Sequence, residues 1–100
     1  PKVYCYCSDT MYDERYFEQI KGADTLYHEA TFMHDMLERA LETHHTTAQQ
    51  AAEIAKKVGA KKLLIGHFSS RYKTLEGLLE EAQAGFENTV LATEGKTFEI

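Results

Sequence analysis

The chain alternates short runs of β-forming residues with helical segments, and this alternation limits its possible folds more than any other feature. The predicted strands cover 3–7, 25–29, 61–66, 89–92 and 97–100, with a hairpin turn at 93–96. The predicted helices cover 13–21, 47–58 and 74–86, and 33–43 is predicted to be part helix and part loop. Alternating units of this kind favour an α/β fold, with helices packed on a sheet.

The ends of the helices are marked by capping residues. Thr46 and Thr47 are both suitable N-caps, and a glutamine follows each of them at the capping-box spacing. Gly59 is expected to end this helix, and Thr74 is expected to cap the last one. The segment 33–43 has a helical period but no clear stop signal.

Size and charge set outer limits on what the chain can be. One hundred residues predict a single domain with one modest core. No apolar run approaches the roughly 20 residues that span a bilayer, and the strand-like start predicts no signal peptide. The net charge of −5 argues against a free-standing nucleic-acid binder, but not against a nuclease whose metal ions carry the local positive charge.

The two cysteines, Cys5 and Cys7, share one face of the first predicted strand. A bridge between them would be strained, so reduced thiols are expected, as in a cytoplasmic protein. Buried small side chains are the favoured interpretation, and a metal-binding pair is the alternative.

Three polar side chains lie at or just after the carboxyl ends of predicted strands, namely Asp9, Glu29 and His67. Sites in α/β sheets gather at the carboxyl ends of strands, which makes these positions candidates for one site. Each also has an ordinary structural explanation. Asp9 could be a turn residue, Glu29 a solvated carboxylate, and His67 a core histidine.

A buried glutamate needs a partner, and His45, just before a predicted helix, is the natural one. A carboxylate that orients an imidazole makes it a suitable proton donor. His34 and His44 are neighbouring candidates that the sequence hardly separates from His45.

Four segments resemble the C-terminal motifs of ribonuclease Z, the tRNA 3′-processing endonuclease of the metallo-β-lactamase superfamily. They are Tyr6-Cys7-Ser8-Asp9-Thr10, His28-Glu29-Ala30-Thr31-Phe32, His45-Thr46-Thr47 and Gly66-His67-Phe68-Ser69-Ser70-Arg71-Tyr72. The resemblance implies that residues 1–100 form the C-terminal half of an αββα sandwich, with helices on a mixed sheet and the N-terminal half absent.

By the same resemblance, Asp9 bridges two zinc ions, His67 binds one of them, and Glu29 with His45 delivers a proton to the leaving 3′ oxygen. Ser69 and Arg71 are candidate substrate contacts. The family's His-x-His-x-Asp-His signature, which supplies most of the zinc ligands, does not occur in the chain. The chain alone is therefore expected to be an inactive fragment with an incomplete ligand set.

The resemblance further implies a cytoplasmic enzyme that acts on precursor tRNA, with no membrane or DNA partner. Half a sandwich would expose apolar sheet surface, so a homodimer is expected. Two alternatives stay open. One is a non-catalytic α/β domain that acts through protein association, in which Glu29 and His45 need not approach Asp9 and His67. The other is a different phosphodiesterase of the same superfamily.

Overall fold

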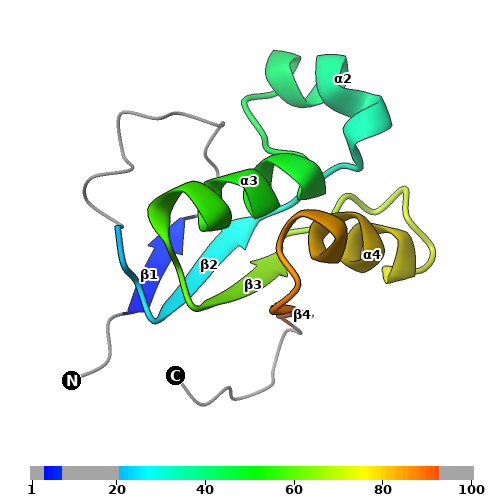
Figure 1. The fold of residues 1–100 in the computed structure, drawn as a ribbon. Coiled ribbons are helices and arrows are strands. Elements are labelled where there is room, and N and C mark those ends of the chain that lie inside the picture. Colours follow the sequence, from blue (N-terminus) through cyan, green and yellow to red (C-terminus); the bar gives the residue numbers. More distant parts are fainter. Residues whose placement is uncertain (1–3, 8–20, 93–100) are drawn as a thin grey trace.

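A computed structural model describes residues 4–7 and 21–92, which form a sheet covered on one face by helices (Figure 1). The strands are β1 (Tyr4–Cys7), β2 (Thr25–Glu29), β3 (Lys62–Gly66) and β4 (Thr89–Leu91). The helices are the 3-10 turn η2 (His34–Met36), α2 (Leu37–Glu42), α3 (Ala48–Val58) and α4 (Glu76–Gly85). Within the described residues, no helix is long and apolar enough to cross a membrane.

The four described strands lie in the order β1-β2-β3-β4, and every neighbouring pair is parallel. Strand β2 therefore has partners on both sides, and Glu29 at its carboxyl end is in register with Gly66. The α/β class is confirmed. The sheet was expected to be mixed, whereas its described part is parallel, and the hairpin that would add an antiparallel strand lies at 93–100, outside the described residues.

Helix α3 begins and ends as its sequence predicts. The Thr47 hydroxyl accepts a hydrogen bond from the Gln50 backbone N–H, and the Gln50 side chain accepts one from the Thr47 N–H, which completes a capping box. Gly59 ends the helix with φ of 71°, in the left-handed region that glycine adopts without a steric cost. Four alanines on the buried face let the helix lie close to the sheet.

Helices α3 and α4 pack against each other over one face of the sheet (Figure 1). The core between them and the strands is built from alanines and branched aliphatic residues: Leu26, Ala48, Ala51, Ala52, Ile54, Ala55, Val58, Leu63, Ile65, Leu78 and Ala82. Cys5 packs against this core as a free thiol, in agreement with the structural interpretation of that cysteine. The side chain of Cys7 lies outside the described part of the structure.

The start of the last helix differs from the prediction. Thr74 does not cap α4, because the N-cap is Leu75 and no side chain caps the helix there. Glu81, in the middle of α4, instead accepts hydrogen bonds from the backbone N–H groups of His34 and Gln49, and so links α4 to the starts of η2 and α3. The ambiguous segment 33–43 contains the turn η2 followed by α2. The predicted helix at 13–21 lies largely outside the described residues.

Candidate active site around Glu29

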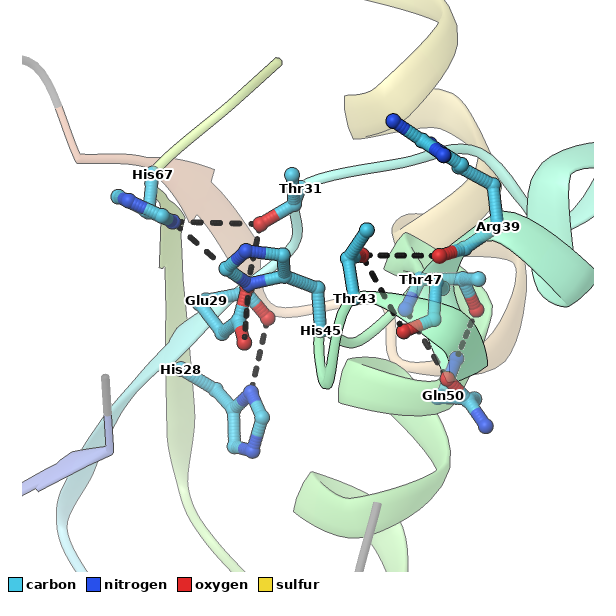
Figure 2. Close-up of polar contacts among 10 residues, drawn as sticks. His28, Glu29, Thr31, Arg39, Thr43, His45, Thr47, Gln50 and His67 are labelled. Carbon is cyan, nitrogen blue, oxygen red and sulfur yellow. Dashed lines mark hydrogen bonds and ion pairs between the residues drawn. The ribbon is translucent and has the colours of Figure 1, made fainter. Parts of the chain in front are cut away.

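The carboxylate of Glu29 is completely buried at the end of the central strand β2. A charged group in such a place is unfavourable unless other groups donate hydrogen bonds to it. Thr31 and His45 form hydrogen bonds with it, and Nδ1 of His67 lies 3.7 Å from Oε2, so that side chains from three segments surround the carboxylate (Figure 2). The local fold explains why these segments meet.

Residues 30–32, directly after β2, are held between two other segments by backbone hydrogen bonds. On one side, the Thr31 N–H donates to the Thr46 carbonyl at 3.0 Å, and the Ala48 N–H donates to the Phe32 carbonyl at 2.9 Å. On the other side, the Ala30 N–H donates to the Gly66 carbonyl at 2.8 Å, and the Ser69 N–H donates to the Thr31 carbonyl at 2.9 Å. The segment before α3 and the segment after β3 are thus fixed on either side of Glu29.

His45 is positioned by the way α2 ends. His44 adopts a left-handed conformation with φ of 59°, which reverses the chain after the helix. The His45 N–H donates to the Ala40 carbonyl at 2.8 Å, and the His44 N–H donates to the Leu41 carbonyl at 3.4 Å. These are the two hydrogen bonds of a Schellman motif, formed here without glycine. The motif brings His45 to Glu29 and leaves His44 exposed.

His67 also has a left-handed backbone, with φ of 58°, at the first position after β3. The preceding Gly66 is buried beneath the ring of Tyr27, and a Cβ atom at Gly66 would lie 2.3 Å from the Tyr27 hydroxyl oxygen. Glycine is therefore required there by a close approach. Residues held in a sparsely populated backbone region are concentrated at functional sites.

The hydrogen bonds around Glu29 define a compact cluster of four side chains (Figure 2). Nδ1 of His45 lies 3.1 Å from both Oε1 and Oε2 of Glu29. The Thr31 hydroxyl donates to Oε2, and its oxygen lies 3.2 Å from Nδ1 of His67. Nδ1 of His67 is 3.7 Å from Oε2. The two imidazole rings are 5.4 Å apart between centroids, so both histidines face one carboxylate.

His28, next to Glu29, is buried on the opposite side of the strand. Its Nδ1 donates to the backbone carbonyl of Glu29 at 2.8 Å, which fixes the proton on that nitrogen. Burial lowers the pKa of His28 below its ordinary value of 6.5, although the hydrogen bond to Glu29 and the nearby carboxylate act in the opposite direction. His28 is therefore a neutral structural residue.

Glu29, His45 and His67 offer nitrogen and oxygen atoms within 4.8 Å of one another, the one such group among the described residues that could hold a metal ion. Imidazole nitrogen and carboxylate oxygen are ordinary zinc ligands. The inner atoms of this group, however, already have partners. Nδ1 of His45 lies 3.1 Å from Oε2 of Glu29, and Nδ1 of His67 lies 3.2 Å from the Thr31 oxygen and 3.7 Å from Oε2. This arrangement fits zinc better at Nε2 of His67, with Thr31 and Glu29 supporting the ring from behind.

The structure brings together Glu29, His45 and His67, three of the six site residues predicted from the sequence. Of the rival histidines, His34 is engaged with Thr47, at 3.0 Å between Nδ1 and Oγ1. Ser69 accepts the Arg71 N–H at 3.3 Å in the turn after His67, and the Arg71 side chain is exposed. Asp9 lies outside the described residues.

Thr31 is a site residue that was not among the candidates predicted from the sequence. Its only signal was its place two residues after Glu29, where a strand would keep both side chains on one face. In the structure, this hydroxyl donates to the carboxylate, and its oxygen lies 3.2 Å from Nδ1 of His67.

Comparisons with known proteins agree with this fold. Residues 2–68 match the family model of the beta-lactamase superfamily domain, so the chain belongs to that superfamily. Within it, the chain is 55% identical over 99 residues to ribonuclease Z of Cytophaga hutchinsonii and 56% identical over 94 residues to ribonuclease Z of Porphyromonas gingivalis. These alignments cover 99% and 94% of the chain but 32% and 31% of the relatives, so the chain spans about a third of their length.

Solved structures give the same result. The metallo-beta-lactamase fold protein YhfI of Bacillus subtilis has a TM-score of 0.85 at 28% identity, covering 96% of this chain and 39% of its own. The long form of RNase Z from yeast has a TM-score of 0.76 at 31% identity, covering 89% of this chain and 12% of its own. The fold and the resemblance to ribonuclease Z that the sequence predicted are both confirmed.

Proposed function

We propose that this chain carries the proton-transfer half of the active site of a zinc-dependent ribonuclease that removes the 3′ trailer from precursor tRNA. The observation that carries the proposal is the buried carboxylate of Glu29, which holds His45 at 3.1 Å and lies 3.7 Å from His67. The enzyme interpretation required these residues to converge. A domain that acts only through protein association would leave a buried acid with two histidines unexplained.

His45 is the proton donor in this proposal. Its Nδ1–H donates to Glu29, so Nε2 is the nitrogen that can exchange a proton with the substrate. The side chain is 23% exposed, which leaves the ring accessible from solvent while the glutamate stays dry. In this proposal Glu29 orients the ring through Nδ1, and a protonated His45 would give its Nε2 proton to the leaving 3′ oxygen when the phosphodiester is cleaved.

His67 and Asp9 are the proposed zinc ligands of this chain. Asp9 would bridge two ions and His67 would bind one of them, with the remaining ligands supplied by parts of the enzyme that the chain does not contain. Bound zinc would supply a Lewis acid for the phosphate and activate the attacking water. The chain's own contribution is to hold the His67 ring in place through Thr31 and Glu29.

Substrate and partners follow from the same proposal. Arg71 is exposed four residues after His67, where a guanidinium can bind a phosphate of precursor tRNA, and Ser69 shapes the turn between them. The enzyme would work in the cytoplasm as a homodimer. The 100 residues alone would bind zinc weakly at most and would not process tRNA.

The test uses a chimera in which these 100 residues replace the matching stretch of the Cytophaga hutchinsonii ribonuclease Z. We expect the chimera to bind zinc and remove the trailer from a precursor tRNA, while the isolated chain does neither. His45→Ala should lower the cleavage rate by roughly 10²–10⁴-fold, the range of general acid–base contributions. His34→Ala is the matched control and should keep the activity, since His34 bonds to Thr47 and not to Glu29.

A folded chimera that binds zinc but leaves precursor tRNA intact would overturn the substrate assignment. Equal activities of His45→Ala and the unmodified chimera would overturn the assignment of the proton donor. Size-exclusion chromatography with light scattering tests the homodimer separately.

A further inference from the structure

The hydroxyl of Thr31 lies between the carboxylate of Glu29 and the ring of His67 (Figure 2). Thr31 is only 6% exposed, and its backbone N–H and carbonyl are bound by Thr46 and Ser69. The residue is thus held from both sides of its backbone. Because the backbone is fixed and the hydroxyl is only one bond beyond Cβ, the fold largely sets the position of this hydroxyl.

The hydrogen bonds of this hydroxyl determine which ring nitrogen of His67 carries the proton. A threonine hydroxyl has one proton to donate, and the carboxylate of Glu29 only accepts hydrogen bonds. The Thr31 proton therefore goes to Oε2 of Glu29. At 3.2 Å, the Thr31 oxygen then faces Nδ1 of His67 as an acceptor, which places the ring proton on Nδ1. Nε2 carries the lone pair, and this is the form in which an imidazole binds a metal.

We propose that Thr31 is a positioning residue that fixes the tautomer of His67 and thereby selects Nε2 as its zinc-binding nitrogen. This inference rests on the proposed function, since it assigns a support to a proposed zinc ligand. Glu29 then acts on both histidines, directly on His45 and through Thr31 on His67. His45 donates to the buried carboxylate itself, whereas His67 donates to the Thr31 oxygen, whose own proton goes to the same carboxylate.

The competing explanation is that Glu29 holds His67 by itself. Oε2 is 3.7 Å from Nδ1 of His67, longer than a hydrogen bond and longer than the 3.2 Å to the Thr31 oxygen. The experiment must therefore separate loss of the hydroxyl from loss of the carboxylate.

The variants are Thr31→Val and Thr31→Ser in the same chimera. Valine keeps the shape and removes the hydroxyl, whereas serine keeps the hydroxyl. Thr89→Val is the matched control. Thr89 is another buried threonine, it lies on β4, and its hydroxyl donates to the backbone carbonyl of Phe86. It should lower stability without changing the site.

The first readout is the ring-nitrogen NMR spectrum of ¹⁵N-histidine in the metal-free chimera at pH 8, with His67 assigned from His67→Gln. We expect the tautomer with the proton on Nδ1 in the unmodified chimera, in Thr31→Ser and in Thr89→Val, and a mixture of tautomers in Thr31→Val. The second readout is the zinc Kd from chelator competition. Thr31→Val should weaken zinc binding by roughly 10–100-fold, the usual effect of removing a support of a metal-binding histidine. Thr31→Ser should stay within about threefold of the unmodified chimera, because the hydroxyl is kept.

Two results would overturn the proposal. One is a proton on Nε2 of His67 in the unmodified metal-free chimera, which needs no variant to detect. The other is an unchanged tautomer and zinc Kd in Thr31→Val, which would assign the support of His67 to Glu29. Neither readout uses tRNA, so failure of the chimera to cleave precursor tRNA would count against the proposed substrate and not against Thr31.

Discussion

Nδ1 of His45 lies at the same distance, 3.1 Å, from both oxygens of the Glu29 carboxylate, although 16 residues separate the two in the chain. The carboxylate is wholly buried and the imidazole is partly exposed. The pair therefore joins a buried carboxylate to a ring that solvent can reach. Such a pair should act as one unit.

Glu29→Gln should lower the turnover of the chimera on precursor tRNA by roughly 10²-fold or more, because an amide has one acceptor oxygen in place of the two that now face His45 Nδ1 and therefore orients the ring less well. Residues that act as a unit give non-additive effects. We therefore expect the double variant Glu29→Gln/His45→Ala to be no slower than His45→Ala alone, within about threefold. Single-turnover cleavage kinetics measure both effects. Multiplication of the two losses in the double variant would show that the residues act independently.

His28 should make the fold less stable in acid. Its pKa in the folded state is lowered by burial, so between the unfolded value of 6.5 and the lower folded value only the unfolded chain binds the proton. The free energy of unfolding should then fall as the pH drops below 6.5, by at most about 1.4 kcal/mol per pH unit for this one group. Denaturant titrations of the chimera between pH 8 and pH 5 measure the slope.

His28→Gln removes this titration while keeping a side-chain donor. The free energy of unfolding of the variant should change with pH in parallel with that of the unmodified chimera above pH 7.5. Below pH 6.5 it should fall less steeply. The same acid slope in both proteins would assign the acid sensitivity to other groups.

Gly66→Ala should destabilise the fold by about 1–3 kcal/mol, the usual cost of overpacking a buried site. The added Cβ would lie 2.3 Å from the Tyr27 hydroxyl oxygen and 2.9 Å from two ring carbons. Gly77→Ala is the control, because the Cβ there meets only the flexible end of Met33, at 3.2 Å, and helix α4 gains a better helix former. Denaturant unfolding compares the two. If the Tyr27 ring is the cause, adding Gly66→Ala to Tyr27→Ala should lower the stability much less than adding it to the unmodified chimera.

The two left-handed helix ends predict opposite effects. Gly59→Ala should destabilise the chimera by about 1–2 kcal/mol, the cost of a left-handed conformation for a residue with a Cβ atom. Apart from the chain neighbours of Gly59, no atom of the described residues lies within 4 Å of the added Cβ, so this cost is conformational. His44→Gly should stabilise by up to about 1 kcal/mol, because its backbone has φ of 59°. Equal effects of both variants would mean that backbone conformation does not control these ends.

Sequence reasoning reached the sheet and helix α3 because their signals are local. The apolar run of β3, the capping box at Thr47 and the stop at Gly59 each depend on neighbouring residues. The end of α2 was not predictable in this way, because a histidine takes the position where glycine is usual. The start of α4 was predicted two residues early, at a threonine that does not act as a cap.

Strand-end positions indicated Glu29 and His67, and the place of His45 before a helix made it the natural partner of Glu29. The resemblance then implied their roles, and the geometry added Thr31. Its role depends on backbone contacts with Thr46 and Ser69, which are separated from it by 15 and 38 positions in the sequence and come close only after the sheet forms. The spacing of a motif shows which side chains are available. It does not show which of two nitrogens carries a proton.

The left-handed backbone of His67 also narrows the evolutionary choices at that position. Among non-glycine residues, asparagine, aspartate and histidine adopt positive φ most readily. Of the side chains that bind zinc well, aspartate could therefore replace histidine without loss of backbone geometry, whereas cysteine would pay a steric penalty for its Cβ atom. For the proposed zinc ligand at this strand end, the backbone conformation thus restricts the choice of residue before any metal chemistry is selected.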